Sequence, residues 1–177
     1  MALLEKQLVV KKSTLPGAGN GLFTKKFIPK DTRIVEYKGR ITTWKEADHD
    51  GGMNFYLFCV KRNHTIDARP YKKALGRFAN DVNGPGKIAG VRNNSVFVID
   101  GLQVFIESTR DIPAGAEVFV DYGKDYWKVL KKIFREKAAE EKKEKAGGKK
   151  TKKAVVKKAQ KGSAKKTKKG GTKKTKA

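Results

Sequence analysis

The amino-acid sequence predicts a mainly β domain made of many short strands, followed by a charged helix and a basic tail. Between residues 8 and 122, short segments rich in Val, Ile, Phe and Tyr are separated by turns that contain glycine or proline. Apolar residues recur with the period of a helix only from Tyr126 onward. The strands and their turns therefore define the domain, and helix belongs mainly to its C-terminal side.

The charge of the chain divides it into two unlike parts. The 177 residues carry a formal net charge of +24. Residues 1–127 hold 20 Lys and Arg against 14 Asp and Glu, whereas residues 128–177 hold 22 against 4. The length indicates one domain, and the first part is long enough to bury a core. The second part has a different character and is expected to act separately.

Cysteine usage and the N-terminal residues exclude several classes of protein. Cys59 is the only cysteine, so neither an internal disulfide nor a zinc-binding cysteine cluster can form. No other metal-ligand spacing stands out. The apolar run at residues 2–4 is too short for a signal peptide, and no window could span a bilayer. We expect a soluble protein in a reducing compartment, without a membrane partner.

The first half of the domain reads as strands joined by tight turns. A glycine-dense turn at residues 16–21 separates the first two strands, and Gly39 interrupts the next two. A dinucleotide site is not indicated, because a helix would have to follow the glycines. Thr43 with Glu46 three residues later predicts a short helix over residues 43–48. The strands expected here are residues 8–13, 22–26, 33–37 and 40–42.

The second half continues the same pattern. Helical turns are expected over residues 71–78, and Asp100 with Gly101 predicts a hairpin. Gly123 ends the last strand. A charged helix is predicted over residues 128–145. Residues 146–177 contain Lys, Ala, Thr and Gly without acid or aromatic residue, so they cannot bury a core and are predicted to be disordered. The strands expected here are residues 55–60, 65–68, 96–99, 102–108 and 117–122.

Five stretches, taken in order, resemble the SET-domain family of protein lysine methyltransferases. The resemblance covers residues 7–127 and lacks the zinc-binding cysteines that some relatives carry after the domain. It implies several small sheets and a C-terminal strand that threads beneath a loop as a pseudoknot. The basic tail is similar to those of linker histones and bacterial histone-like proteins. The five stretches are residues 19–23, 35–39, 76–81, 110–117 and 120–123.

The resemblance implies S-adenosyl-L-methionine as the cofactor. Glycines in the first turn would let the backbone approach it closely, and the amide of an asparagine can both donate and accept hydrogen bonds. The sequence departs from the family pattern at Asp81, where relatives have histidine, and at Val82, where they have serine. The implied cofactor-binding residues are Gly19, Asn20, Gly21, Arg77, Phe78, Asn80, Tyr122 and Trp127.

The implied catalytic residues are Tyr122, at the point of methyl transfer, and Tyr37, beside it. Transfer to lysine needs a neutral amine, which a buried channel favours, and aligned groups that exclude water. Taken alone, either tyrosine could equally be a packing aromatic residue. Val120 stands where relatives carry the residue that sets the number of methyl groups, so this number is not predicted. His49 and His64 are expected to lie on the surface.

Two functions remain open at this level. The first is a lysine N-methyltransferase that acts on histones, on other basic nucleic-acid-associated proteins or on its own tail. The second is a nucleic-acid-compacting protein whose SET-like domain is inactive, an alternative that Asp81 keeps open. In either case residues 146–177 are expected to bind nucleic acid without sequence preference, although they could also serve solubility or nuclear targeting.

The place of action and the oligomeric state are less determined by the sequence. Because basic proteins bound to nucleic acid are the expected substrates, we expect the nucleus or chromosome in a eukaryotic or viral source. In a bacterial source the corresponding place is the cytoplasm or nucleoid. The sequence does not define an oligomeric state.

Overall fold

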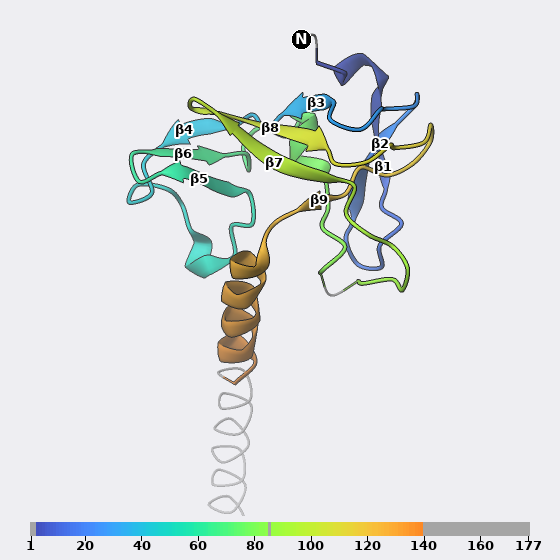
Figure 1. Cartoon of the computed structure of the whole chain (residues 1–177). Coiled ribbons are helices and arrows are strands. Elements are labelled where there is room, and N and C mark those ends of the chain that lie inside the picture. Colours follow the sequence, from blue (N-terminus) through green and yellow to red (C-terminus); the bar gives the residue numbers. More distant parts are fainter. Residues whose placement is uncertain (1–2, 85, 140–177) are drawn as a thin grey trace, which may run out of the picture. The chain divides into compact units, whose positions relative to one another are not determined.

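The computed structural model describes residues 3–84 and 86–139 and has the predicted mainly β architecture (Figure 1). Within the described residues the strands form three small sheets of two, four and three strands. Short 3₁₀ helices lie between them: η1 (Glu5–Gln7), η2 (Asp50–Gly52) and η3 (Leu75–Phe78). The close spacing of turns in the sequence is therefore reflected in strands too short to form one large sheet.

The two-stranded sheet carries the glycine turn. It pairs β1 (Leu8–Lys12) with β2 (Asn20–Thr24) in antiparallel register. The connecting turn contains Gly17 and Gly19 with φ of 77° and 72°, a left-handed conformation that glycine adopts without steric cost. Leu22 in β2 is completely buried. The hairpin thus presents a sharp turn at one end and packs into the core at the other.

The four-stranded sheet is the centre of the domain. Its strands follow the order β3 (Arg33–Glu36), β8 (Gln103–Ser108), β7 (Ser95–Asp100) and β9 (Val120–Asp121). The predicted β7–β8 hairpin is confirmed, with Gly101 at φ 61° in its turn. Only the pairing of β7 with β9 is parallel within this sheet. After β8 the chain therefore crosses over to the far side of β7, where β9 forms the edge of the sheet, instead of continuing as a meander.

The three-stranded sheet lies between β3 and η3 in the sequence. Its order is β4 (Arg40–Thr42), β6 (His64–Asp67) and β5 (Leu57–Lys61), and both pairings are antiparallel. Asp67 is buried at the end of β6, and its carboxylate forms an ion pair with the guanidinium of Arg40, with 3.2 Å between Oδ2 and Nη2. This sheet places Tyr56, which directly precedes β5, beside the central sheet.

The helix predicted over residues 43–48 is wrong, although its capping contacts do form. The backbone N–H of Glu46 donates to Thr43 Oγ1 over 3.2 Å, and this hydroxyl donates to the Glu46 carboxylate over 2.9 Å. The chain then makes a turn and not a helix. Asp50 and Gly51 have φ of 47° and 58°, which a right-handed helix does not accept. Local capping chemistry cannot extend a helix against this reversal.

The C-terminal segment of the domain, residues 117–122, contacts three separate parts of the chain. Only β9 within it is a strand, because its other pairings are single bridges to β2 and to Asn80. This interleaving is what a C-terminal pseudoknot requires. Three backbone hydrogen bonds show it: Val118 N–H to the Leu22 carbonyl (2.7 Å), Val120 N–H to the Asn80 carbonyl (2.9 Å) and Ser95 N–H to the Phe119 carbonyl (2.9 Å).

Three clusters of buried apolar side chains form the core. Phe97 packs against the first and the second of them, and Tyr122 packs against the first. The tyrosines and phenylalanines that join the clusters are therefore held by rigid surroundings. The first cluster includes Leu22, Ile34, Ile106, Val118 and Val120; the second is Tyr37, Ile66, Ala68 and Val104; the third is Leu15, Val82 and Phe119.

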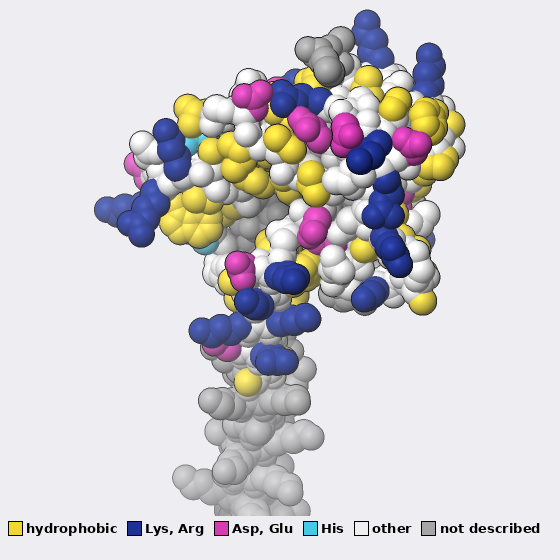
Figure 2. Space-filling view, in the orientation of Figure 1, with side chains coloured by type: hydrophobic (Ala, Val, Ile, Leu, Met, Phe, Trp, Pro, Cys, Tyr) yellow, Lys and Arg dark blue, Asp and Glu magenta, His cyan; other side chains and the backbone are white. Residues whose placement is uncertain are grey.

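A helix starts at residue 124, soon after the domain strands end, and continues to residue 139, the last described residue. It begins earlier than the predicted helix of residues 128–145, whose last part lies outside the described residues. The predicted tail, residues 146–177, also lies outside them. Lys and Arg side chains gather on the described part of this helix (Figure 2). None of the described helices is long and apolar enough to cross a membrane.

Candidate active site

Tyr122 lies directly after β9 and its hydroxyl has a fixed position. The hydroxyl donates to the carbonyl of Ala79 over 2.7 Å, immediately before Asn80. The ring stacks on Phe97 with centroids 6.1 Å apart, and meets the edge of Tyr126 at 4.9 Å. This contact satisfies the buried hydroxyl and fixes its direction. Here one side chain joins the end of β9 to the segment that carries Asn80.

Tyr37, the second predicted catalytic residue, reaches the same phenylalanine from the opposite strand. It follows β3, is buried, and donates its hydroxyl to the carbonyl of Tyr56 over 3.0 Å. Its ring meets Phe97 edge-on with centroids 5.5 Å apart. Tyr37 and Tyr122 therefore belong to one aromatic cluster with Phe97 at its centre. Sequence reasoning placed both tyrosines at the site but missed the phenylalanine that joins them.

Burial keeps the hydroxyls of this cluster protonated. It raises the pKa of Tyr122 well above the ordinary tyrosine value, and it also raises the pKa of Tyr37. Burial, followed by the nearby charge of Asp81, raises the pKa of Tyr126 to about 12. At neutral pH these groups are polar donors without charge. They can orient a substrate amine, but they cannot act as a strong base toward it.

Glu117, which sequence reasoning treated only as part of a motif, is a buried connection point of the site. Its two oxygens accept hydrogen bonds from the loop before the glycine turn and from Asn80. Burying a carboxylate is unfavourable unless such bonds are made. The donors are Ser13 Oγ at 2.6 Å, Thr14 Oγ1 at 2.7 Å, Thr14 N at 2.8 Å and Asn80 Nδ2 at 3.3 Å.

The carboxylate of Glu117 lies against the glycine turn and limits which residues the turn can contain. A Cβ at Gly21 would overlap Glu117 Oε1, so this position has room for glycine alone. Gly19 has open space around it and is required by its φ of 72°. The carbonyl of Asn20, between the two glycines, accepts a hydrogen bond of 3.0 Å from Asn80 Nδ2. The predicted residues Gly19, Asn20, Gly21 and Asn80 are thus brought together.

Asp81, the departure from the family pattern, is buried and accepts four hydrogen bonds. Its carboxylate holds the backbone of Tyr122 and the indole of Trp127, residues that follow it by more than 40 positions. Asp81 therefore fixes the end of β9 and the start of the following helix. The donors are Asn83 N and Asn93 Nδ2 on Oδ1, both at 2.8 Å, and Tyr122 N at 2.9 Å and Trp127 Nε1 at 2.7 Å on Oδ2.

Trp127 lies over the face of Tyr122. Its ring is parallel to that of Tyr122 within 11°, with centroids 6.1 Å apart, and it meets Tyr126 edge-on at 5.2 Å. The backbone of Gly84 packs against the indole of Trp127, and a Cβ added at Gly84 would lie 3.0 Å from this ring. Trp127 therefore covers the aromatic cluster from the side of the helix.

Two of the predicted cofactor residues, Arg77 and Phe78, have other protein groups as their contacts. The guanidinium of Arg77 lies 4.1 Å from the ring centroid of Tyr56 and donates to the carbonyl of Arg69 over 3.2 Å. Phe78 packs against the first core cluster. Val120 is completely buried in that cluster. The structure thus packs Arg77 on Tyr56 and gives Phe78 a packing role in the core, while their helix η3 contacts β1 and β2.

The residues near the glycine turn fit an adenosine-bearing sulfonium cofactor. The turn offers backbone without side-chain bulk at Gly19 and Gly21, and Trp127 offers an aromatic face. Asn80 Oδ1 has no hydrogen-bond partner among the described residues, so an acceptor is available beside that backbone. No group of His, Cys, Asp and Glu in the described part of the chain could hold a metal ion.

Comparison with known proteins identifies the family. The family model described as "SET domain" matches residues 19–123, more than half of the chain. A Chaetomium thermophilum protein named "Histone-lysine N-methyltransferase EZH2" is 27% identical over 140 residues, 72% of this chain and 9% of that protein. Zea mays proteins named "Histone-lysine N-methyltransferase EZ1" and "EZ2" are each 30% identical over 68% of this chain and 13% of their own length.

The chain therefore belongs to the SET-domain family, and the family predicted from the five stretches is confirmed. The mainly β fold of small sheets agrees with this assignment. The match covers only a small part of each of these relatives, whose names therefore describe much longer proteins.

Substitution of Asp81 by Asn should destabilise the domain and release Trp127. Each carboxylate oxygen of Asp81 accepts two N–H donors, and asparagine would replace one of these oxygens by an NH₂ group, which cannot accept them. The free energy of unfolding should therefore fall by about 1–3 kcal/mol. In a Trp44→Phe background, where Trp127 alone emits, its fluorescence should also shift toward that of exposed indole. Chemical denaturation and emission spectra measure both effects.

Asp121→Asn is the matched control, because Asp121 is exposed and accepts a single hydrogen bond, from the backbone of Gly123. It removes the same charge one residue away from Tyr122 and should change stability by no more than about 0.5 kcal/mol. Equal effects of the two substitutions would show that Asp81 does not hold the indole.

Alkaline pH should destabilise the domain through the buried tyrosines. Unfolded tyrosines lose their protons near pH 10, whereas those of the cluster keep theirs, so the unfolded state binds fewer protons as pH rises. The free energy of unfolding should therefore fall between pH 10 and pH 12, whereas below that range the contribution of these groups is fully present and does not change with pH. Denaturation at several pH values, with tyrosinate absorbance, tests this. In Tyr126→Phe the free energy of unfolding should fall less steeply with pH. An unchanged slope would contradict a raised pKa of Tyr126 in the folded protein.

Proposed function

We propose that this protein is an S-adenosylmethionine-dependent protein lysine N-methyltransferase. The observation that carries the proposal is the position of Tyr122, whose hydroxyl is bonded to the Ala79 carbonyl next to Asn80. The same segment is joined to the glycine turn through Glu117. The Tyr122 hydroxyl, the side-chain amide of Asn80 and the backbone of the glycine turn are thus connected through these hydrogen bonds. The SET-domain family and the names of the relatives support this function.

The proposed cofactor site consists of Gly19, Asn20, Gly21, Asn80 and Trp127. When bound, S-adenosylmethionine supplies an electrophilic methyl group, so the protein need only align and desolvate the nucleophile. Glu117 holds the turn and the amide of Asn80 in fixed positions. Trp127, held by Asp81, provides an aromatic face and excludes water from the side of Tyr122. Arg77 and Phe78 would act indirectly, through Tyr56 and through packing.

The proposed substrate group is the amine of a lysine, approaching between Tyr122 and Tyr37. Burial among aromatic side chains disfavours the ammonium form and so favours the neutral amine that must attack. Tyr122 would orient this amine through its hydroxyl without removing its proton, because the pKa of Tyr122 is raised by burial. The proton would then leave to solvent before the amine enters the aromatic cluster.

Histones or other basic proteins bound to nucleic acid are the proposed substrates, and the tail of this chain is a further candidate. The relatives are named histone-lysine N-methyltransferases, which favours histones or histone-like proteins. Residues 146–177 contain 14 lysines and no acid, a composition that favours binding to phosphates of any sequence. The proposed place of action is therefore the nucleus, chromosome or nucleoid.

The contacts of Asp81 favour an enzyme over an inactive binding module. In the family a histidine stands at this position, and its replacement was the reason to consider an inactive domain. In this chain Asp81 holds both the Tyr122 backbone and Trp127. Aspartate at this position thus forms its own hydrogen bonds within the candidate site, which supports an active enzyme.

Tyr122→Phe should lower methyl transfer by roughly 10²-fold while leaving the fold intact. It removes one hydroxyl that is bonded to Ala79 and keeps the ring that packs on Phe97. The assay combines the full chain, isotopically labelled S-adenosylmethionine and a histone mixture, with mass spectrometry of all proteins present. Asn80→Ala should instead weaken cofactor binding, measured by calorimetry. Wild-type turnover in Tyr122→Phe would show that the point of transfer is assigned wrongly.

Removal of residues 146–177 should abolish most salt-sensitive DNA binding and spare methylation of a short peptide. The deletion takes away 14 lysines and leaves a net charge of +10 out of +24. Because counterion release grows with the phosphates neutralised, the salt dependence of binding should become much shallower. DNA binding over a salt series and peptide methylation are measured for both chains. Equal salt slopes would place the nucleic-acid surface elsewhere.

A further inference from the structure

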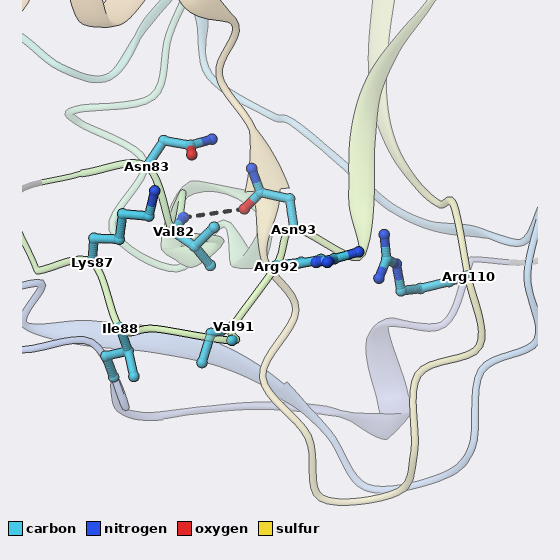
Figure 3. A pocket seen from close by; sticks show the side chains of 9 residues that line it. Val82, Asn83, Lys87, Ile88, Val91, Arg92, Asn93 and Arg110 are labelled. Carbon is cyan, nitrogen blue, oxygen red and sulfur yellow. Dashed lines mark hydrogen bonds between the residues drawn. The ribbon is translucent and has the colours of Figure 1, made fainter.

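A cavity of the domain is lined by no residue of the glycine turn or the aromatic cluster, although two of its residues, Asn83 and Asn93, bind Asp81. This cavity of about 450 Å³ is formed by the loop between η3 and β7 together with Arg110, which follows β8 (Figure 3). None of its lining residues is a tyrosine of the cluster or part of the glycine turn. The function proposed above therefore leaves this cavity without a role.

Three cationic side chains line the cavity, and no acidic residue lines it. They belong to Lys87, Arg92 and Arg110. None of the three has an ion pair with another described residue, whereas Arg33 and Arg69 are each paired with two carboxylates. The side chains of Arg92 and Arg110 point toward one another (Figure 3). Two like charges in this arrangement repel, and an anion between them would remove the repulsion.

The rest of the cavity combines apolar and fixed polar groups. Val82, Ile88 and Val91 line it and belong to, or pack against, the third core cluster. Asn93 is held on both sides, since its amide donates to Asp81 over 2.8 Å and accepts from the backbone of Val82 over 3.1 Å. This wall is therefore preformed. A ligand would find an apolar surface next to the cationic groups.

The geometry points to a binding site for a nucleotide, with its phosphate between Arg92 and Arg110. Guanidinium groups match phosphate oxygens with paired hydrogen bonds, and Lys87 adds a third charge. The volume falls within the range of small-molecule sites, about 300–1,000 Å³, and exceeds what an isolated phosphate would fill. The sugar or base would pack on Val82, Ile88 and Val91. The nucleotide is either free or one unit of a single-stranded nucleic acid.

The test uses the full chain with thymidine 5′-monophosphate and a short oligothymidylate as probes. Thymidine shares no adenine with the proposed methyl donor, so binding to that site is avoided. Calorimetry should show that Arg92→Gln with Arg110→Gln weakens binding of at least one probe by about tenfold or more, because charge-assisted hydrogen bonds are lost. Weaker binding of both probes would show that a free nucleotide is sufficient. Weaker binding of the oligothymidylate alone would show that the site takes one unit of a single-stranded nucleic acid. Both results support the site.

The matched control is Lys45→Gln with Arg62→Gln, which removes the same charge from exposed positions outside the cavity. It should weaken binding no more than about twofold, through general electrostatics. The pocket variant should keep the wild-type thermal unfolding temperature, since it loses no ion pair; if it fails to fold, Arg92→Lys with Arg110→Lys replaces it.

Three outcomes would overturn the inference. The first is an equal effect of the pocket and control variants, which would leave only general attraction by the charge of the chain. The second is displacement of the thymidine probe by S-adenosylmethionine, which would make the cavity part of the cofactor site. The third is binding of a phosphoserine peptide but of neither nucleotide probe. Because none of these measurements records methyl transfer, their failure is distinct from failure of the proposed enzyme activity.

Discussion

The buried carboxylate of Glu117 is the interaction on which the arrangement of the site depends. It joins the loop before the glycine turn, the turn itself and Asn80. Ser13 and Glu117 are 104 positions apart in the sequence, so this contact closes nearly the whole domain. A buried carboxylate without these donors would be strongly unfavourable. The same bonds that compensate its burial therefore also bring the proposed cofactor-binding groups together.

A second buried carboxylate fixes the other end of the same segment. Glu117 begins it, and Asp81 binds the backbone of Tyr122 at its end and the indole of Trp127 beyond it. The ring of Tyr122 is thus positioned through both flanking connections and through its own hydroxyl. Rigid placement of a polar, uncharged group is what an alignment-dependent reaction needs. The aspartate at the family's histidine position keeps this placement with different partners.

The domain separates two kinds of chemical environment. The aromatic cluster around Phe97 consists of uncharged side chains with the Asp81 carboxylate beside it, and burial keeps its hydroxyl groups protonated. The cavity of Arg92 and Arg110 is cationic and has no acidic residue in its lining. The first environment suits a neutral amine, whereas the second suits a phosphate. Asp81 and Asn93, which are bonded to each other, lie between these environments and contact both.

The sequence by itself determined the class of fold and the family, and it proposed most of the residues of the candidate site. Strand patterns and turn glycines act over a few residues, so the β7–β8 hairpin and the glycine turn were predicted correctly. The helix over residues 43–48 was not, because the backbone reversal at Asp50 and Gly51 overrides the local cap. The tertiary structure decided the contacts of Glu117, Asp81 and Phe97, and the packing of Arg77 on Tyr56. Each of these depends on contacts between residues far apart in the chain, and a local pattern carries no record of which distant donor will satisfy a buried acid.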